Sequence, residues 1–271
     1  MTVTVAAART VTGMTDADYR AAAGVSQTGL KLILDSPARY QWEIKNPRQR
    51  KHFDFGHVVH SLILGRGLDA HIVDAASWVG KAAQQEADEA RAAGKVPILA
   101  KDYQRALDAA AAVRDHPLAG PMLAHPGESE VAMFWTDQET GVACKALVDR
   151  LTVTADETHW LFDPKHTSRS AQPRAFARDA ATYGYHVQAA FYLDGYHAIT
   201  GEQGRFVNVV VEGDAPHLVS VVELDTEAID VGRARYRDAL DIYARCVETG
   251  QWPGYTEALA ETISLPRWAT Y

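Results

Sequence analysis

The sequence predicts an α/β (α+β) fold in which a mixed sheet is flanked by helices and preceded by a helical N-terminal region. Apolar residues recur at helical spacing through the first third of the chain, which predicts helices there. After Pro117 the period changes to short runs of β-branched and aromatic residues separated by turn formers, which predicts strands. Beyond these runs, helical and strand-like segments alternate, as is typical of a layered domain.

Helices are expected throughout the N-terminal region. Ser26 is a suitable N-cap for "QTGLKLILDS", and Ser36 with Pro37 opens "ARYQWEI". The segment "FGHVVHSLILG" repeats apolar residues at helical spacing. The Ala-rich stretch from 82 to 112 is also expected to be helical, and its last part, "DYQRALDAAAAVRDH", stops at Pro117.

Strands are expected in two groups. The runs "EVAMFWTD", "VACKALVDRLTV" and "HWLFD" are separated by the turn formers "DQETG" and "TADET", so we expect an antiparallel meander over residues 130–163. A helix is expected across residues 183–199. Strands at 205–213 and 217–224 and a helix from about Thr226 to Val247 should follow.

Composition limits the function classes. The chain has 271 residues, 47% of them hydrophobic and 23% charged, which is typical of a globular protein. No apolar run approaches the roughly 20 residues of a membrane span, and the N-terminus lacks the apolar stretch of a signal peptide, so a cytoplasmic protein is expected. Cys144 and Cys246 are the two cysteines, which excludes a disulfide framework and a four-thiolate cluster. The net charge of -8 argues against a protein that coats nucleic acid, but it does not exclude a local basic groove.

The stretch "FDPKHTS" places Asp163 and Lys165 two positions apart at the end of a strand-like run. With 35 acids in the chain, about one acid-x-Lys pair arises by chance, and "EIK" at 43–45 is a second match. The context of Asp163 is different, because Asp149 ends the preceding run and a "DETH" turn lets that run fold back. We therefore expect the two carboxylates to converge.

Converging carboxylates predict a magnesium site. Mg²⁺ binds through one or two carboxylates and keeps water and phosphate oxygens as its other ligands. Lys165 lies on the same strand face as Asp163, where its ammonium can orient or help deprotonate an attacking water. Pro164 points to the opposite face, and its carbonyl stays available as a ligand. Because proline removes one ladder donor, a bulge or an unpaired donor position is expected at this strand end.

Two pairs of residues at helical spacing could support such a site. Gln188 and Tyr192 are four apart on the helix that follows, so they share one face. Gly56 and His60 are four apart on an earlier helix, where the small residue permits close packing and the imidazole could bind a metal. Each pair also has a plain interpretation as ordinary helix residues, with His60 as a hydrogen-bonded core histidine. Asp163 and Lys165 could likewise be a surface ion pair.

The order GxxxH, Asp149, "DPK" and QxxxY resembles the RecB-type nuclease branch of the PD-(D/E)XK superfamily. The segments "SQTGLKLILDSPARYQWEI", "FGHVVHSLILG", "ESEVAMFWTDQETGVACKALVDRL", "YGYHVQAAFYLDG" and "LPRWA" together resemble the phage RecE-type, or exodeoxyribonuclease VIII-like, exonucleases. The resemblance implies a single nuclease domain over residues 1–271. Its helical N-terminal region would span about 15–125, its catalytic sheet and flanking helices about 126–250, and its C-terminal tail 251–271.

The resemblance further implies an exonuclease that depends on Mg²⁺ or Mn²⁺, with two ions per site. It would degrade one strand of linear double-stranded DNA from the 5′ end and leave a 3′ overhang for a recombinase or single-strand annealing protein of a phage or prophage. The site residues carried over are the metal ligands His60, Asp149, Asp163 and the Pro164 carbonyl, the catalytic Lys165, the supporting Gln188 and Tyr192, and Glu130 near the metals.

The residues themselves offer candidates for substrate contacts, and the resemblance implies a mode of assembly. Thr167, Ser168 and Arg169 follow the lysine directly and are candidates for holding a substrate phosphate. The basic stretch "KNPRQRKHF" is either a solvated loop or a contact to the DNA backbone. Its cations are Lys45, Arg48, Arg50 and Lys51. The family forms ring-shaped homo-oligomers around DNA, and a basic bore within an acidic exterior would accommodate the net charge.

Three departures from the family pattern leave a second hypothesis open. Pro164 stands where Leu or Ile is usual, His166 replaces a threonine, and Leu147 stands where an arginine often precedes Asp149. None of them removes a ligand. The alternative to the exonuclease is a non-catalytic DNA-end-binding or recombination scaffold with the same fold, and a further alternative is an endonuclease or a repair nuclease of other polarity.

Overall fold

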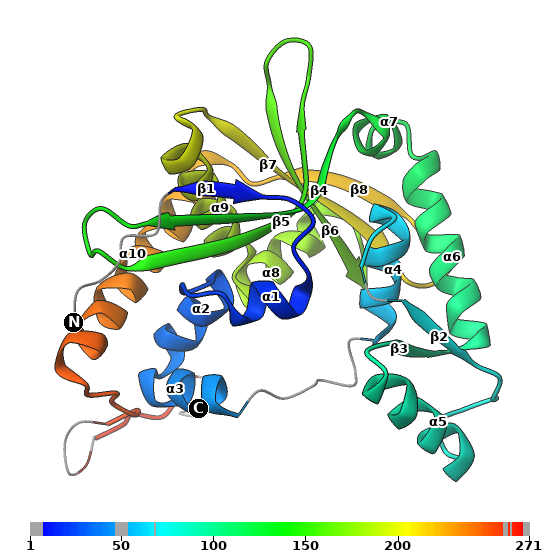
Figure 1. Ribbon diagram of the computed structural model, residues 1–271, viewed down its shortest axis with the longest axis horizontal. Coiled ribbons are helices and arrows are strands. Elements are labelled where there is room, and N and C mark those ends of the chain that lie inside the picture. Colours follow the sequence, from blue (N-terminus) through cyan, green and yellow to red (C-terminus); the bar gives the residue numbers. More distant parts are fainter. Residues whose placement is uncertain (1–7, 47–53, 68, 257–259, 261, 268–271) are drawn as a thin grey trace.

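The structure is a computed structural model that describes residues 8–46, 54–67, 69–256, 260 and 262–267. A six-stranded sheet with the strand order β1-β4-β5-β6-β7-β8 forms its centre, with helices on both faces (Figure 1). This arrangement confirms the predicted mixed sheet flanked by helices. Within the described ranges, no helix is both long and apolar enough to cross a membrane.

The sheet combines antiparallel and parallel pairs. Strands β4, β5 and β6 form the predicted meander, since each pairs antiparallel with the next. Strands β6 and β7 are parallel, and a parallel pair needs a long crossover, which here contains two helices. The strands are β1 (Arg9–Val11), β4 (Gly127–Thr136), β5 (Ala143–Val153), β6 (His159–Thr167), β7 (Gly204–Glu212) and β8 (Val219–Glu223).

The helices pack in two layers, one on each face of the sheet. On the first face, Met133 and Leu161 of the sheet pack against Phe191 of α9. On the opposite face, Phe162 and Val209 pack against α4 and α6. Burying each such side chain stabilises the fold by about 1.5–3 kcal/mol. The first layer contains α2 (Gln27–Asp35), α3 (Pro37–Lys45), α8 (Pro173–Tyr183), α9 (Tyr185–Thr200) and α10 (Thr226–Thr249), and the second contains α4 (Asp54–Leu64) and α6 (Ala100–Asp115).

The N-terminal region also contains strands, where only helices were expected. β2 (Ala70–Val73) pairs in parallel with β3 (Val96–Leu99), so the Ala-rich stretch is not one helical segment but α5 (Lys81–Ala92), a strand and α6. All residues of β3 are buried, and burial of this apolar run outweighs the helix propensity around it. Two short helices complete the described elements, α1 (Asp16–Ala21) and α7 (Ala119–Ala124).

Helix α8 was also missed, although both of its ends carry ordinary signals. Pro173 stands in its first turn, and Gly184 follows its last residue with a φ of +67°, a conformation that glycine adopts without strain.

Ser26 and Ser36 cap α2 and α3 as expected, because their hydroxyls accept the backbone N–H of Gly29 and Arg39.

The sheet splits between β5 and β6. Their pairing runs from Val153↔His159 only as far as Arg150↔Phe162. Beyond that point Val25 takes the place beside β5, since its N–H donates to the Ala143 carbonyl at 2.8 Å in a parallel bridge. Gly24 precedes it with a φ of +122°, and a Cβ there would lie 3.1 Å from the Cys144 carbonyl carbon. The segment that leads into α2 is therefore inserted between the two diverging strands.

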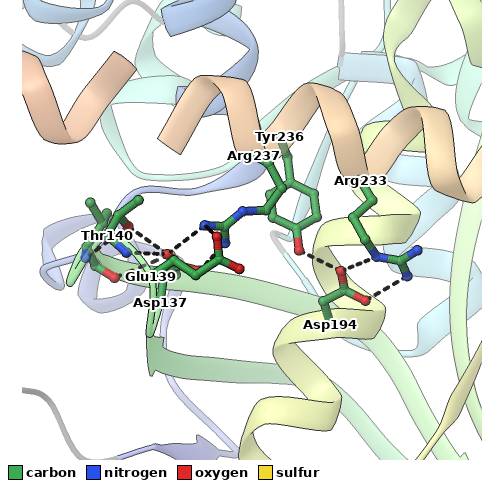
Figure 2. Close-up of polar contacts among 9 residues, drawn as sticks. Asp137, Glu139, Thr140, Asp194, Arg233, Tyr236 and Arg237 are labelled. Carbon is green, nitrogen blue, oxygen red and sulfur yellow. Dashed lines mark hydrogen bonds and ion pairs between the residues drawn. The ribbon is translucent and has the colours of Figure 1, made fainter. Parts of the chain in front are cut away.

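Helix α10 is fastened to the rest of the domain by two groups of charged residues (Figure 2). Arg233 and Tyr236 of α10 donate to Asp194 of α9, with the Arg233 nitrogens 2.7 and 2.9 Å from the carboxylate oxygens. Arg237 donates to Asp137 in the β4–β5 turn, whose Oδ1 also accepts the N–H of Thr140 at 2.9 Å. The second group ties the hairpin of β4 and β5 to the first helix layer.

The Asp137 carboxylate should stabilise the fold in a pH-dependent way. Burial works to raise the pKa of Asp137, but hydrogen bonds from Arg237 and Thr140 lower it below its ordinary value. A lowered folded-state pKa adds stability above the unfolded pKa of about 3.9, and this stability is lost as the pH falls through the folded value. Asp137→Asn should therefore cost about 2 kcal/mol at neutral pH and progressively less below about pH 4, measured by urea unfolding.

Glu139 provides the matched control. It contacts the same arginine at 2.9 Å, but its side chain is 79% exposed, so Glu139→Gln should leave the free energy of unfolding nearly unchanged. A cost of Asp137→Asn that stays constant from neutral to acid pH would show that the charge of Asp137 does not stabilise the fold.

Candidate active site

Asp163 and Lys165 lie on β6 just beyond the split, on the face that α9 covers. The Lys165 ammonium is 2.5 Å from the Asp163 Oδ2, and Asp163 is only 3% exposed. The lysine also lies over the ring of Tyr185, with its nitrogen 4.8 Å from the ring centre. The predicted acid-x-Lys pair is thus a buried ion pair rather than a surface one.

Two amides complete the surroundings of Asp163. Gln188 of α9 donates its Nε2 to the Asp163 Oδ1 at 2.7 Å. Asn208 of β7 donates its Nδ2 to the Asp163 Oδ2 at 2.9 Å, because the parallel register places the two residues side by side. Three donors therefore hold this carboxylate, and Oδ1 keeps capacity for a further ligand.

Asp149 of β5 also belongs to this site, and it lies where the pairing between β4 and β5 is interrupted. The ladder skips one position between Ser129↔Arg150 and Val131↔Val148, where Glu130 lies opposite Asp149 with a φ of +55°. Such strained backbone in a residue other than glycine is concentrated at functional sites. Asp149 lies within the strand rather than at its end as expected, since β5 continues to Val153.

His60 of α4 contacts Asp149 directly, with its Nε2 3.0 Å from the Asp149 Oδ2. Helix α4 covers the second face of the sheet and α9 the first, so the two acids are held by helices from opposite layers. Beside His60 lies a cavity of about 390 Å³, which Glu130 and Arg20 also line. Glu130 and His60 thus line the same cavity.

The two acids have unequal electrostatic surroundings. Burial and the charge of Asp149 raise the pKa of Asp163 despite the opposing effect of Lys165. Burial would also raise the pKa of Asp149, but His60 and Lys165 together lower it. Burial works against the charge on Lys165, but the two acids raise the pKa of this lysine, which stays charged. The surroundings therefore move the pKa values of the two acids in opposite directions.

These residues fit a hard divalent cation by their chemistry. Asp149 and Asp163 lie close enough for each to shift the pKa of the other, and two carboxylates are what Mg²⁺ needs from a protein. Among the described residues, however, no three His, Cys, Asp or Glu side chains already converge on one point as a metal-binding set. The oxygens of the two acids face His60 and Lys165 instead, so a metal would have to displace or share these contacts.

Other predicted residues are placed as follows. Tyr192 is buried against the ring of Phe206 at 5.8 Å, where burial raises the pKa of its hydroxyl. Pro164 is buried, and its pairing with Val209 continues without a bulge. Of the two expected alternatives, the structure shows the unpaired position, since β6 has no β5 partner at Pro164. Ser168 and Arg169 are exposed directly after β6. Lys45 ends α3, whereas Arg48, Arg50 and Lys51 lie outside the described residues.

His166 does not enter the site, because it lies on the opposite strand face. Its ring packs edge-on against Phe55 at 4.8 Å, and burial together with the charge of Arg105 lowers its pKa. A Cβ at Gly213 would lie 2.3 Å from the His166 Nε2, so this glycine makes room for the ring. At Gly56 an added Cβ would meet the same ring only at 3.8 Å, an ordinary contact, so Gly56 is not required for close packing.

Sequence reasoning missed Asn208 and Lys31 at this site. Asn208 is fully buried, and its place as a polar residue inside the apolar run "RFVNVVVEG" could have indicated a role at the site. Lys31 of α2 carried no signal, because a lysine on an amphipathic helix is ordinary; only the split of the sheet brings it near Lys165.

Comparisons with known proteins agree with this fold. A family model described as a PDDEXK-like domain of unknown function (DUF3799) matches residues 26–264. A crystal structure from Eubacterium rectale, of a protein with a provisional exonuclease assignment, is similar with a TM-score of 0.60 at 12% identity, over 94% of this chain and 97% of that one. The structure of SSO0001 gives a TM-score of 0.37 at 12% identity, over 84% and 76% of the chains. No curated protein has a significant sequence match.

Asn208 should determine how well Asp163 binds a metal. Asn208→Leu keeps the side-chain size but removes a donor to the carboxylate, so Mn²⁺ binding measured by calorimetry should weaken by about tenfold. Gln203→Leu removes an exposed amide just before the same strand and should bind Mn²⁺ like the wild type. Equal affinity of Asn208→Leu and wild type, at matched thermal stability, would contradict this role.

Metal binding should also compete with a proton at His60. Burial works to lower the pKa of His60, but Asp149 raises it above its ordinary value of about 6.5. Below that raised pKa the imidazolium repels a cation, so Mn²⁺ affinity should increase as the pH rises from about 6 to about 8.5. Calorimetry should show that His60→Gln binds more weakly at the upper pH but with a flatter pH dependence. An unchanged pH dependence in this variant would exclude His60 as the competing group.

Proposed function

The chain belongs to the DUF3799 family of PDDEXK-like domains, and from this fold and its site we propose that the protein is a metal-dependent deoxyribonuclease. One observation carries the proposal. Asp149 and Asp163 meet where β5 and β6 diverge, and Lys165 is held against Asp163 at 2.5 Å. Paired acids with an adjacent charged lysine are suited to hydrolysis of a phosphodiester, whose transition state gains negative charge.

Each side chain has a distinct task in this proposal. Asp149 and Asp163, with His60 and the Pro164 carbonyl beside them, would hold the metal. A bound Mg²⁺ or Mn²⁺ would polarise the scissile phosphate and lower the pKa of a ligated water. Lys165 stays protonated, so it orients the attacking water and stabilises charge on the phosphate oxygens. Gln188 and Asn208 keep the Asp163 carboxylate fixed while the Lys165 ammonium turns toward substrate.

The finer form of the proposal is a 5′-directed exonuclease of the RecE type. It would act on linear double-stranded DNA and leave 3′ overhangs for a recombinase or annealing protein of a phage or prophage. The motif order GxxxH, Asp149, "DPK" and QxxxY supports it, as does the fold shared with the Eubacterium rectale protein. A ring-shaped homo-oligomer with two metal ions per site belongs to the same proposal.

Substrate contacts would continue along the chain after Lys165. Ser168 and Arg169 are exposed next to the site, and the Arg169 side chain is 68% exposed, so both can reach a phosphate. Arg48, Arg50 and Lys51 follow one another closely in the sequence and would add cations to the substrate contacts, since phosphate neutralisation requires clustered cations.

The second candidate is a DNA-end-binding scaffold without activity. Pro164 and His166 are the reason to consider this scaffold, because they alter the strand that carries Asp163 and Lys165. The continuous β6–β7 register argues against the scaffold, because it keeps Asp163 and Lys165 on the face of α9.

End-labelled DNA tests the proposed function. Linear duplex labelled separately at its 5′ and 3′ ends is incubated with Mg²⁺, Mn²⁺ or EDTA. We expect metal-dependent release from the 5′ end that is lost in Asp163→Ala. Lys165→Met should lower the rate by about 10²–10⁴-fold, because it removes the charge beside the reacting phosphate.

Lys101→Met is the matched control. Lys101 is an exposed lysine on α6, and in the described part of the chain its Nζ donates a hydrogen bond only to the Ala76 carbonyl. This variant should cleave like the wild type. Tight binding of DNA ends without cleavage under either metal would favour the scaffold, and release from the 3′ end would contradict the proposed polarity.

A further inference from the structure

Helix α2 brings a second lysine to the split in the sheet. Val25 occupies the position beside β5 that β6 leaves, and α2 begins two residues later. Lys31 lies one turn into this helix. Its Nζ contacts the Tyr183 carbonyl, and Lys165 lies over the ring of Tyr185, two residues further on, which places the Lys31 side chain beside the candidate active site.

The position of Lys31 is fixed by its surroundings. Its Nζ donates to the Tyr183 carbonyl at 2.9 Å, at the end of α8. A Cβ at Gly184 would lie 2.8 Å from the Lys31 Cδ, and Gly184 also has a φ of +67°. Glycine at 184 thus leaves a path for the lysine between α8 and α9.

Lys31 lacks a carboxylate of its own. In the part of the chain that the structure describes, no acid forms an ion pair with it, and its recorded hydrogen bond uses one of three N–H donors. Burial and the charge of Lys165 lower the pKa of Lys31 to about 8. The nearby Asp163 is already engaged by Lys165, Gln188 and Asn208. In the described part of the chain, two N–H donors of the Lys31 ammonium are therefore left without a side-chain acceptor, an arrangement that favours an added anion.

The surface next to Lys31 combines cations with exposed aromatic rings. The Tyr183 ring is 48% exposed and lies 5.8 Å from that of Tyr185. The Arg169 Nη2 is 3.3 Å from the Tyr183 hydroxyl. Asp179 lies 3.5 Å from the same guanidinium and offsets part of its charge. Cations beside open aromatic faces are the usual components of single-strand nucleic-acid sites.

We propose that Lys31 binds a backbone phosphate of the DNA strand that is being cleaved, next to the scissile phosphate, and that Tyr183 stacks on a neighbouring base. The inference rests on the proposed nuclease function and adds a substrate subsite to it. Lys165 serves the reacting phosphate, whereas Lys31, Tyr183 and Arg169 position the adjoining nucleotide.

The competing interpretation is structural, because Lys31 also caps the last carbonyl of α8. Lys101 separates the two roles, since its Nζ makes the same kind of contact, to the Ala76 carbonyl at 3.0 Å. Lys31→Met and Lys101→Met each lose one lysine–carbonyl hydrogen bond, and only the first is expected to lose a phosphate contact.

The test measures binding of a fluorescently labelled DNA duplex with a single-stranded end, in EDTA, by anisotropy over a series of salt concentrations. Lys31→Met should bind about tenfold more weakly. The slope of the logarithm of the binding constant against the logarithm of the salt concentration should decrease in magnitude by about 1, as expected for the loss of one phosphate contact. Lys31→Arg should restore most of the slope, Lys101→Met should match the wild type, and Tyr183→Leu should weaken binding without changing the slope.

A slope for Lys31→Met equal to that of the wild type would overturn the subsite and leave Lys31 as a structural cap. If the wild type then still cleaves DNA, the proposed function stands without it. If the wild type neither binds nor cleaves DNA, both proposals fail together.

Discussion

The divergence of β5 and β6 is the constraint on which the rest of the site depends. Where the ladder stops after Arg150↔Phe162, two strands that are adjacent in the sheet expose side chains to one another across an open seam. Asp149 and Asp163 lie at this seam, one on each strand. Helices from both layers reach it, α4 with His60 and α9 with Gln188, so a single break in hydrogen bonding brings together residues from four elements.

Such a seam must be supported, because unpaired strand backbone inside a domain is costly. Val25 supplies the missing partner for β5, and Gly24 lets the chain approach closely enough. Lys145 then donates to the carbonyls of Tyr19 and Ala22 and holds the end of α1 nearby. The N-terminal segment therefore forms part of the candidate active site, and it is the reason that α2 passes close to Lys165.

Charge balance at the seam follows from the same geometry. Two buried carboxylates would repel each other strongly, and a buried charge persists only when it is paired and hydrogen-bonded. His60 and Lys165 each neutralise one acid, while Gln188 and Asn208 satisfy remaining lone pairs of Asp163. The unusual His166 is accommodated separately, on the other strand face, by the space at Gly213. The His166 side chain therefore leaves the acids and the lysine in place.

The sequence by itself determined the local features. Cap residues, the change of period after Pro117 and the spacing of Asp149, "DPK" and QxxxY are short-range signals, so the meander and most helices could be predicted, as could the grouping of Asp149, Asp163, Lys165 and Gln188 as candidates for one site. Only the tertiary structure decided the others. Burial made a strand of "VPIL", the parallel β6–β7 register brought Asn208 to Asp163, and the split of the sheet placed Lys31 beside Lys165. These contacts join residues far apart in the chain, and no local pattern encodes which strands separate or which helix enters the gap.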